Sequence, residues 1–463
     1  MEKFDLVVIG SGPAGEKAAL QAAYYGQSVC VVDRGPAGGA WVNTGTIPSK
    51  TLRESALYLA GGRQRGVVTD PSATPTVRSF MALKRHLVTR WREKIETSFR
   101  SHNVARRRGD ARFIDGHTLD LGNGVQLSGE HIMIATGSQP RAVPELPVDG
   151  ESIHDSETLL KLEKIPYSMI VLGGGVIACE YASIFQALGV QVTLINGRGR
   201  LLGFIDVEAS DFLQDALTDG GMMVRHNARA ESLGRPGKGQ VEVYLDDGTI
   251  AAAETVFVAL GRTAVLDDLN LEAAGVELTE WGTIQVDNHM RSNVSHIYAA
   301  GDVVGFPSLA SSGMEQGRVA ASHMFGHERD PLSELIPGGI FTIPELSSIG
   351  LDEAAARKAG FDPVTGSAQY RESVRAPMLG DEHGLVKLVA DRETKKLLGA
   401  TIVGNQATEL IHFAMAVIKY GGTVTDLIHF VFNLPSLSAL YRQAAYTVLH
   451  QIDEGSCAPR KIS

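Results

Sequence analysis

Cysteine is scarce in this sequence of 463 residues, which contains only Cys30, Cys179 and Cys457. None of the three stands within metal-ligand or CxxC spacing of another, so neither a metal site nor a dithiol redox motif is predicted. Cys30 and Cys179 fall in apolar segments, where a cysteine typically serves as a small buried hydrophobe. This cysteine usage is typical of a reducing compartment, and we expect a cytoplasmic protein.

Long apolar runs are absent as well, and no stretch approaches the ~20 residues that a membrane-spanning helix needs. The N-terminal MEKFD has no signal-peptide character. Positive charge is also in deficit, because the formal net charge is −10 and the one basic cluster is the Arg-Arg-Arg run at 106–108. That run precedes a Gly-Asp turn, which is typical of a solvated loop. We therefore expect neither a membrane nor a nucleic acid as a partner.

A nucleotide-binding pattern is present at the N-terminus. An apolar strand predicted at 6–9 leads into GSGPAG, and a helix and a second strand ending at Asp33 follow. Gly10 permits a tight turn, Gly12 lets a pyrophosphate approach the backbone, and Gly15 allows close packing of helix on strand. We expect the phosphates at the helix N-terminus and the adenosine ribose at the Asp33 carboxylate.

A second copy of this pattern occupies residues 169–202. Gly173, Gly175 and Ala178 fill its three small-residue positions, and a helix and a second strand again follow. Two such folds in one chain predict two dinucleotides, a tightly held flavin and a nicotinamide.

The second copy ends at Asn196 instead of an acid, and Arg198 and Arg200 follow. A carboxylate at this place binds the 2′-OH of NAD and repels the 2′-phosphate of NADP, whereas an amide beside guanidinium groups tolerates both nucleotides. We expect both arginines to contact the cofactor. The alternative is that they simply face solvent.

A long amphipathic helix is predicted over 80–104, with Leu83, Leu87, Trp91 and Ile95 on its apolar face. We interpret Trp91 as a packing residue.

With 463 residues, the whole chain is long enough for about three domains. Besides the two nucleotide-binding patterns, it contains the strands that leave the two nucleotide folds and a C-terminal part of different character. Strands predicted at 132–135 and 255–258 run into Gly137 and Gly261, and the strand at 297–300 leads to Asp302. From about residue 338 an α+β domain without a nucleotide pattern is predicted. Its strands are expected at 341–344, 385–389 and 398–403, and its helices at 409–420 and 437–449.

Together these motifs resemble the FAD-dependent pyridine nucleotide-disulfide oxidoreductase family, which includes glutathione reductase and dihydrolipoamide dehydrogenase. The resemblance rests on GSGPAG with Asp33, IPSK at 47–50, ATGS at 135–138, GGGVIACE at 173–180, ALGR at 259–262 and YAAGD at 298–302. Within the family the sequence is most similar to soluble pyridine nucleotide transhydrogenases, through VNTGTIPSKTLRE, LINGRGRLLGFID, PSLASSGMEQGR, FTIPELSSIG and FNLPSLSALYR.

The resemblance implies an α/β fold with two Rossmann-like domains and a C-terminal α+β interface domain. The expected boundaries are 1–145 with 265–337 for the FAD-binding domain, 146–264 for the NAD(P)-binding domain and 338–463 for the interface domain. A homodimer formed through the interface domain is also implied.

By the same resemblance, Lys50 lies near the flavin N5 edge and pairs with Glu180, and these two are the expected catalytic residues. A lysine there stabilises negative charge on a reduced flavin, and the carboxylate keeps the ammonium charged. The expected cofactor-binding residues are Gly10, Gly12, Pro13, Ala14, Gly15, Asp33, Arg34, Thr44, Gly45, Thr46, Lys50, Ala111, Thr136, Gly137, Gly173, Gly175, Val176, Ile177, Asn196, Arg198, Arg200, Gly261, Arg262, Gly301, Asp302, Leu309 and Ala310.

The disulfide chemistry of the family is missing. Its reductases carry cysteines at the positions of Trp41 and Thr46, and a His–Glu pair where this chain has the run Leu434-Pro435-Ser436 and Ala439. A thiol–disulfide mechanism needs a thiolate and a proton shuttle, so none is predicted. Trp41 is either packing or a stacking wall for an aromatic oxidant. His412, His429 and Tyr441 are interpreted as core or interface residues.

The predicted function is therefore FAD-dependent hydride transfer between NAD(H) and NADP(H), with hydride passing from one nicotinamide to flavin N5 and on to a second nicotinamide. One alternative is an NAD(P)H dehydrogenase that reduces a quinone, a dye or O2. The other is a flavin-binding redox sensor or complex subunit without turnover, against which the retained Lys50 and Glu180 argue.

Overall fold

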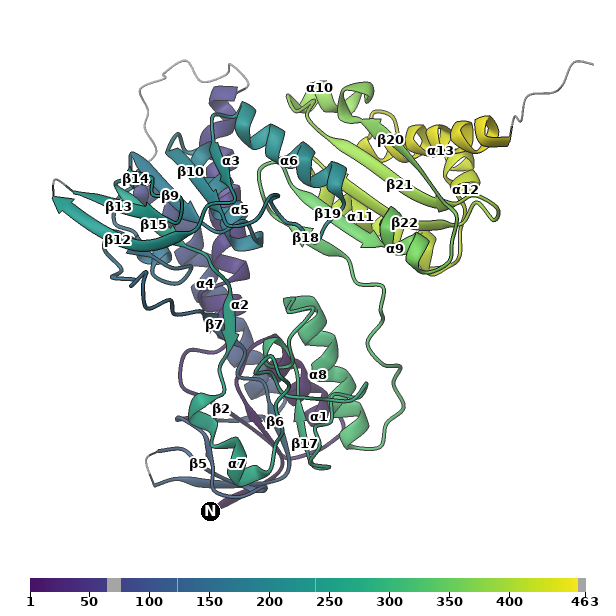
Figure 1. The fold of residues 1–463 in the computed structure, drawn as a ribbon. Coiled ribbons are helices and arrows are strands. Elements are labelled where there is room, and N and C mark those ends of the chain that lie inside the picture. The colour runs from purple at the N-terminus through teal and green to yellow at the C-terminus, as the bar shows by residue number, and fades with distance from the viewer. Residues whose placement is uncertain (65–75, 123, 238, 457–463) are drawn as a thin grey trace, which may run out of the picture.

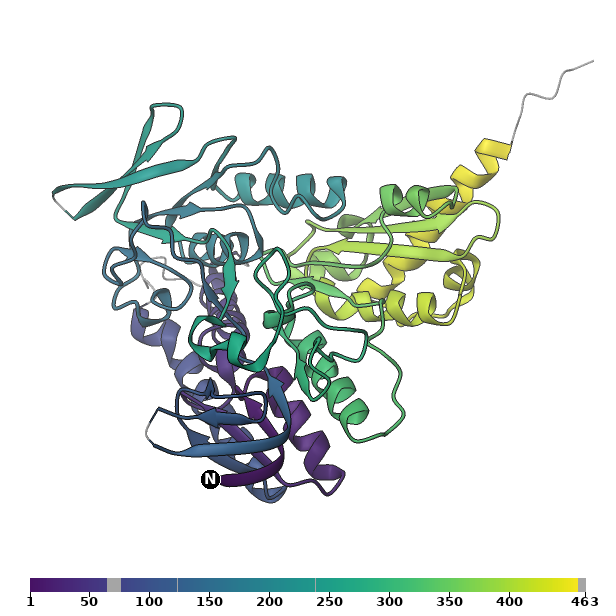
Figure 2. The same cartoon turned by 60° about the horizontal axis from the view of Figure 1, so that its bottom comes forward.

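The structure is a computed structural model that describes residues 1–64, 76–122, 124–237 and 239–456. Cys457 lies outside these residues. Figures 1 and 2 show three bodies, each built around its own sheet. No helix in the described ranges combines the length and apolarity needed to cross a membrane.

The first body is a parallel nucleotide fold with an antiparallel extension. Its strand order is β3-β2-β1-β6-β5-β4, and β17 also pairs with β6. Its strands are β1 (Glu2–Ile9), β2 (Val29–Asp33), β3 (Ala105–Arg108), β4 (Arg112–Phe113), β5 (Thr118–Asp120), β6 (Gln126–Ile134) and β17 (Ile297–Ala299).

Two helices of this body that are far apart in the sequence pack against each other. They are α1 (Pro13–Tyr24) and α8 (Ala310–Met324), and a Cβ at Gly317 would lie only 2.2 Å from the Ala14 carbonyl oxygen. The first body therefore combines the N-terminal segment with residues near 300–324. Its other helices are α2 (Gly39–Asn43), α3 (Thr46–Gln64), α4 (Val77–Ser101) and α7 (Leu271–Ala274).

The second body contains an all-parallel sheet in the order β11-β10-β9-β15-β8, beside an antiparallel sheet β12-β13-β14. The predicted exits from the two nucleotide folds lie side by side, because β7 (Ser138–Pro140) pairs with β16 (Arg262–Ala264). The remaining elements are β8 (Ile153–His154), β9 (Ser168–Leu172), α5 (Val176–Ala187), β10 (Gln191–Asn196), α6 (Val207–Asp219), β11 (Met223–His226), β12 (Ala230–Gly237), β13 (Gln240–Leu245), β14 (Ile250–Ala253) and β15 (Thr255–Val258).

The third body is an antiparallel sheet, β18-β19-β22-β21-β20, with helices packed on it. The strands expected at 385–389 and 398–403 are confirmed as β21 and β22, and the two expected helices as α11 and α13. Its elements are β18 (Gly338–Ile340), β19 (Leu346–Gly350), α9 (Glu353–Lys358), β20 (Pro363–Gln369), α10 (Arg375–Leu379), β21 (Leu385–Asp391), β22 (Leu397–Val403), α11 (Ala407–Lys419), α12 (Val424–His429) and α13 (Leu440–Ser456). The predicted α/β class is confirmed.

The strand predicted at 341–344 is wrong. Residues 341–344 form a loop between β18 and β19, and the N–H groups of Phe341 and Ile343 donate to side chains of α5 instead of a neighbouring strand. Pro344 has no N–H to give to a sheet.

The apolar face predicted for the long helix is only partly right. Leu83 is 45% exposed, whereas Phe80, Val88, Ile95 and Phe99 are buried in α4. A helix has 3.6 residues per turn, so residues spaced by four shift steadily around its axis. Leu83 therefore lies off the face on which Ile95 is buried.

A buried ion pair ties the second body to the third. Lys387 of β21 donates to Asp206 at 3.1 and 2.9 Å and lies 3.0 Å from Glu208. Asp206 also caps the N-terminus of α6 by accepting from the Ala209 N–H. Burial alone lowers the pKa of Lys387, but hydrogen bonds with Asp206 and Glu208 together raise it above its ordinary value.

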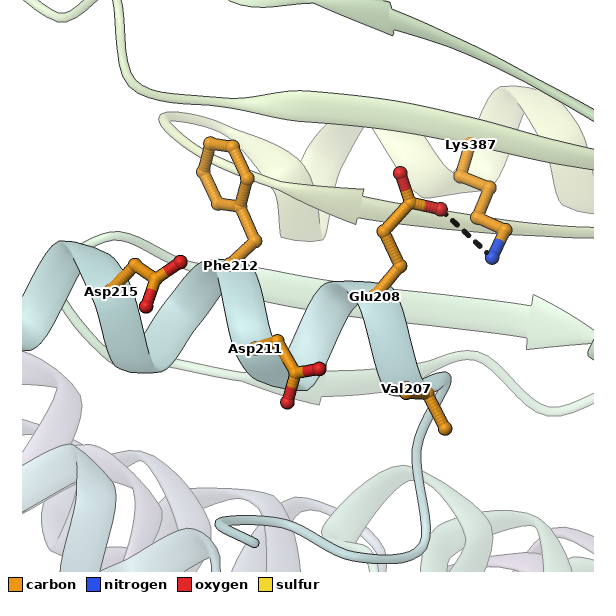
Figure 3. A pocket seen from close by; sticks show the side chains of 6 residues that line it. All are labelled: Val207, Glu208, Asp211, Phe212, Asp215 and Lys387. Carbon is orange, nitrogen blue, oxygen red and sulfur yellow. Dashed lines mark ion pairs between the residues drawn. The ribbon is translucent and has the colours of Figure 1, made fainter.

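Beside this pair, a pocket of about 490 Å³ opens between α6 and β21 (Figure 3). It lies away from the predicted site residues and is lined by Val207, Glu208, Asp211, Phe212, Asp215 and Lys387.

Replacing Lys387 with Met is expected to lower the free energy of unfolding by about 3 kcal/mol, because Asp206 would stay buried without its cation. Since the folded-state pKa of Lys387 is raised, this stabilisation is fully present at neutral pH and disappears only as the pH rises through that value. Urea unfolding at pH 7 and in strongly alkaline buffer measures both effects. Lys358→Met, on an exposed helix end, is the matched control and should change stability by no more than about 0.5 kcal/mol. Equal stabilities of the two variants at pH 7 would contradict the assignment.

Candidate functional site

The N-terminal cradle, formed by Gly10, Gly12 and the start of α1, has free space where a dinucleotide would approach. Gly12 is the N-cap of α1, no side chain caps this helix end, and a Cβ at Gly12 would meet nothing within 4 Å. Gly15 is different, because its Cβ would lie 1.9 Å from the Gly10 carbonyl oxygen. Uncapped N–H groups facing open space fit a pyrophosphate.

Asp33 is held at the rim of this cradle by a residue that sequence reasoning missed. The Ser11 N–H and hydroxyl both donate to one Asp33 oxygen, at 2.8 and 2.5 Å, and Gly35 N–H donates to the other at 3.0 Å. Arg34 instead pairs with Asp110 at 3.4 Å and with Asp268 at 3.6 Å.

The second cradle, formed by Gly173, Gly175 and the start of α5, repeats this design. Gly175 is the N-cap of α5 with no side-chain cap, and a Cβ there would also meet nothing within 4 Å. A pocket of about 200 Å³ lies here. It brings together four predicted residues, Gly175, Val176, Ile177 and Gly261, with Pro140, Ser156, Val258 and Ala259.

Asn196 is turned into its own loop. It is 3% exposed, its Nδ2 donates to the carbonyl oxygens of Arg198 and Arg200 at 3.0 and 2.9 Å, and its Oδ1 accepts from the Arg198 N–H. Arg200 is engaged by Asp211 at 2.8 Å. Arg198 is exposed and forms no ion pair with any described residue. The structure therefore makes Arg198, more than Asn196 or Arg200, available to a 2′-phosphate.

Replacing Arg198 with Ala is expected to raise KM for NADPH about tenfold and to leave KM for NADH within about twofold, because a charge-assisted hydrogen bond contributes about 1.5 kcal/mol. Steady-state kinetics with each nucleotide measures this. Arg225→Ala is the matched control, since Arg225 on the next strand is already paired with Asp247. Equal rises in both KM values would count against a phosphate contact.

Two predicted residues, Asp302 and Arg262, are joined through Ser138 beside the paired strands β7 and β16. Its hydroxyl donates to Asp302 at 2.5 Å and accepts from Arg262 Nε at 2.8 Å. Thr136 donates to the Val265 carbonyl oxygen at 2.7 Å, and Gly301 N–H donates to Gln316 at 2.9 Å. In the sequence, Ser138 is only the last residue of the ATGS motif, and no role was predicted for it.

The other predicted residues flank these elements. Leu309 is the N-cap of α8 and Ala310 its first residue, while Ala14 and Ala111 are buried. Thr44 follows α2, its hydroxyl donating weakly to Glu157 at 3.4 Å, and Thr46 begins α3.

Lys50 and Glu180 are in direct contact across two bodies. Lys50 Nζ lies 2.7 Å from both carboxylate oxygens of Glu180, and the two side chains are 26% and 3% exposed. Phe341 of the third body donates its N–H to Glu180 at 2.8 Å and places its ring 4.8 Å from Lys50 Nζ. The ammonium therefore keeps a partly open side, whereas the carboxylate is buried and accepts from two donors.

The disulfide position is filled by aromatic packing. Trp41 meets Trp91 of α4 edge to face, with ring centroids 5.2 Å apart, which favours the packing interpretation of both tryptophans. Burial raises the pKa of the Cys30 and Cys179 thiols to about 12, so neither supplies a thiolate at neutral pH.

At the C-terminal end of the chain, Leu434 is 79% exposed and Ala439 follows it in a short helical turn. His412 and His429 are exposed in the single chain, so neither is a core residue, and their place at an interface stays a prediction. Tyr441 is fully buried and donates to the Leu410 carbonyl oxygen at 2.7 Å, as a core residue does.

Two dinucleotide cradles joined by a lysine–glutamate pair, with a third domain packed on that pair, define a two-nucleotide flavoprotein oxidoreductase. The chain belongs to the pyridine nucleotide-disulphide oxidoreductase family, whose profile matches residues 4–320. The dimerisation domain of that family matches residues 336–445, in agreement with the predicted homodimer. The predicted oxidoreductase class and the cofactors FAD and NAD(P) are thereby confirmed.

The chain is similar over its full length to proteins named soluble pyridine nucleotide transhydrogenase. It is 40% identical to the one from Mycobacterium bovis (strain BCG / Pasteur 1173P2), covering 98% of both chains, and 39% identical to the one from Hahella chejuensis, covering 97% and 99%. Among solved structures, it resembles the HOCl-induced flavoprotein disulfide reductase RclA from Escherichia coli, with a TM-score of 0.88, 27% identity and coverage of 96% and 100%. LpdA from Mycobacterium tuberculosis matches with a TM-score of 0.88, 28% identity and coverage of 96% and 99%.

Proposed function

We propose that the protein transfers hydride between NAD(H) and NADP(H), with FAD in the N-terminal cradle and one nicotinamide dinucleotide at a time in the second cradle. The observation that carries this proposal is the Lys50–Glu180 pair. It joins α3 of the first body to α5, the helix that begins at the second cradle. The full-length similarity to soluble transhydrogenases supports the same function. The corresponding domain boundaries are 1–145 with 265–337, 146–264 and 338–463.

Each residue group has a separate task in this proposal. Bound FAD supplies the redox centre that takes hydride from one nicotinamide and returns it to another. The uncapped starts of α1 and α5 hold the two pyrophosphates, and Asp33 and Asp302 accept from sugar hydroxyls. Lys50 provides positive charge at the reacting edge, and Glu180 holds that ammonium in place through two hydrogen bonds. No proton relay is required, which is consistent with Leu434 and Ala439 at the positions of the family's His–Glu pair.

An anaerobic titration with NADH and with NADPH, followed by hydride transfer from NADPH to a nicotinamide analogue, tests the proposal. We expect the flavin to bleach with both nucleotides and the analogue to be reduced catalytically. Rapid quinone reduction without any transfer to the analogue would overturn the transhydrogenase assignment in favour of a dehydrogenase. Flavin that stays oxidised with both nucleotides would favour a sensor without turnover.

We also place this activity in the cytoplasm. The cysteine usage of the sequence supports that compartment, as does the word soluble in the names of the relatives.

A further inference from the structure

The segment 341–345, here named the docking segment, forms hydrogen bonds with both α3 and α5. Besides the Phe341 N–H bond to Glu180, the Ile343 N–H donates to Ser183 Oγ at 3.1 Å. Ser183 Oγ in turn donates to the Glu180 carbonyl oxygen at 2.9 Å. Both the side chain and the backbone of Glu180 are therefore tied, directly or through one hydroxyl, to backbone of the third body.

The docking segment also acts on the other member of the pair. The Phe341 ring centroid lies 4.8 Å from Lys50 Nζ, close enough for the aromatic face to attract the ammonium. Lys50 is thus bounded by a carboxylate from the second body and an aromatic ring from the third, and a displacement of Phe341 would release both members at once.

A buried ion pair fastens the docking segment to the helix that carries Lys50. Arg53 lies one helical turn after Lys50 in α3 and is 5% exposed; its Nε donates to the Thr342 carbonyl oxygen at 3.0 Å, and its guanidinium meets Glu345 at 3.0 Å. Glu345 is 7% exposed, and its second oxygen accepts from the N–H and hydroxyl of Thr408 at 3.0 and 2.8 Å. Both charges are therefore satisfied inside the protein.

The need to hold the third body against α3 and α5 does not by itself explain this ion pair. One hydrophobic cluster already joins α3 and α5 to β18, β19 and β22, through buried residues that include Leu52, Ala56, Ile340, Leu346 and Val403. A buried ion pair is weak evidence for added stability, because desolvation offsets its attraction, whereas its directional bonds fix one geometry. The directional bonds here fix the segment that holds Glu180 and Lys50.

We propose that Arg53 and Glu345 are positioning residues, which hold the docking segment so that the Lys50 ammonium and the Glu180 carboxylate stay aligned for hydride transfer. This inference rests on the proposed function of the Lys50–Glu180 pair. It gives the third body a task at the reacting edge within its own subunit, in addition to dimerisation.

The chain offers a matched pair of variants, because Arg53 has two carboxylate partners. Glu345 is buried and leads to the docking segment, whereas Glu54 is 62% exposed and lies 2.6 Å from the same guanidinium on the same helix. In the holoenzyme, Glu345→Gln is expected to slow anaerobic flavin reduction by NADH about tenfold or more, since small displacements of a reacting group carry large rate costs. Glu54→Gln should stay within about twofold.

Two readouts besides activity follow the geometry itself. We expect the backbone amide of Phe341 to exchange its hydrogen at least tenfold faster in Glu345→Gln than in Glu54→Gln, because its bond to Glu180 would open more often. The midpoint potential of the bound flavin should become more negative in Glu345→Gln, since a displaced ammonium stabilises reduced flavin less. A loss of rigidity elsewhere in the third body would move neither quantity.

Wild-type flavin reduction and wild-type Phe341 exchange in folded Glu345→Gln would overturn the inference. If Glu345→Gln does not fold, Thr408→Val takes its place, because it removes one donor to Glu345 and keeps the backbone donor. It should shift exchange, potential and rate in the same directions, and no shift in any of them would also overturn the inference. Failure of both nucleotides to reduce the unmodified protein would instead refute the proposed function.

Discussion

Lys50→Met is expected to slow anaerobic reduction of the bound flavin by NADH and by NADPH about 100-fold. The substitution removes the positive charge at the reacting edge, and one missing electrostatic group of this kind typically costs a factor of about 100 to 1,000. It also leaves Glu180, which is 3% exposed, with the Phe341 N–H but without its cation. Stopped-flow absorbance of the flavin measures the rate.

The same substitution has a structural cost that should be measured beside the rate. Breaking a buried ion pair on one side costs on the order of 3 kcal/mol, so Lys50→Met should also unfold at lower urea concentration. Lys94→Met is the matched control. Like Lys50, Lys94 lies near an aromatic ring, with its Nζ 4.2 Å from the Trp91 ring centroid, but its side chain is exposed. Lys94→Met should reduce its flavin within about twofold of the wild-type rate. Wild-type reduction by Lys50→Met would remove Lys50 from the proposed catalytic residues.

Gly12→Ala and Gly15→Ala are expected to fail in opposite ways, although the two glycines are three residues apart. An alanine at Gly12 meets nothing within 4 Å, so the protein should fold with an unchanged apoprotein melting temperature. The added methyl group occupies the space where the pyrophosphate meets the uncapped helix end, and FAD affinity should fall about 100-fold, or roughly 2.7 kcal/mol. Equilibrium titration of apoprotein with FAD measures this loss.

An alanine at Gly15 is expected to disrupt the fold itself. Its methyl carbon would lie 1.9 Å from the Gly10 carbonyl oxygen, and overpacking against backbone costs about 3 kcal/mol. Thermal melts of the two apoproteins therefore separate a packing glycine from a ligand-facing one. Wild-type FAD affinity in Gly12→Ala would show that the N-terminal cradle does not hold the pyrophosphate as proposed.

The parts of the site that the sequence predicted are those encoded by local spacing. The turn at Gly10, the open position at Gly12 and the acid at Asp33 follow from one strand–turn–helix–strand unit, whose geometry is set within about thirty residues. The same holds for Gly173 and Gly175. The pairing of Lys50 with Glu180 came from the family resemblance, because nothing local to either residue specifies a partner 130 positions away.

The parts that the sequence did not predict depend on contacts between distant segments. A short run such as 341–344 suits a strand by its side chains. That it is a loop shows only in its backbone, because the N–H groups of Phe341 and Ile343 donate to side chains of α5 and not to a neighbouring strand. Asn196 was expected to face the nucleotide, but its amide satisfies the carbonyl groups of its own turn, a competition that side-chain type alone does not decide. The buried pair of Arg53 and Glu345 gave no sequence signal, since each is an ordinary charged residue in its own segment.

The packing of α1 against α8, and of β17 against β6, has a consequence for how this chain is made. Synthesis delivers β1, α1 and β6 long before residues 297–324, so the emerging chain has an uncovered α1 face until α8 appears and an unpaired end of β6 until β17 appears. The second body, whose strands all lie between residues 153 and 258, is complete before the first one and can fold as an insertion in an unfinished domain. Until β17 has emerged, that end of β6 is an open strand edge of the kind that can pair with another chain.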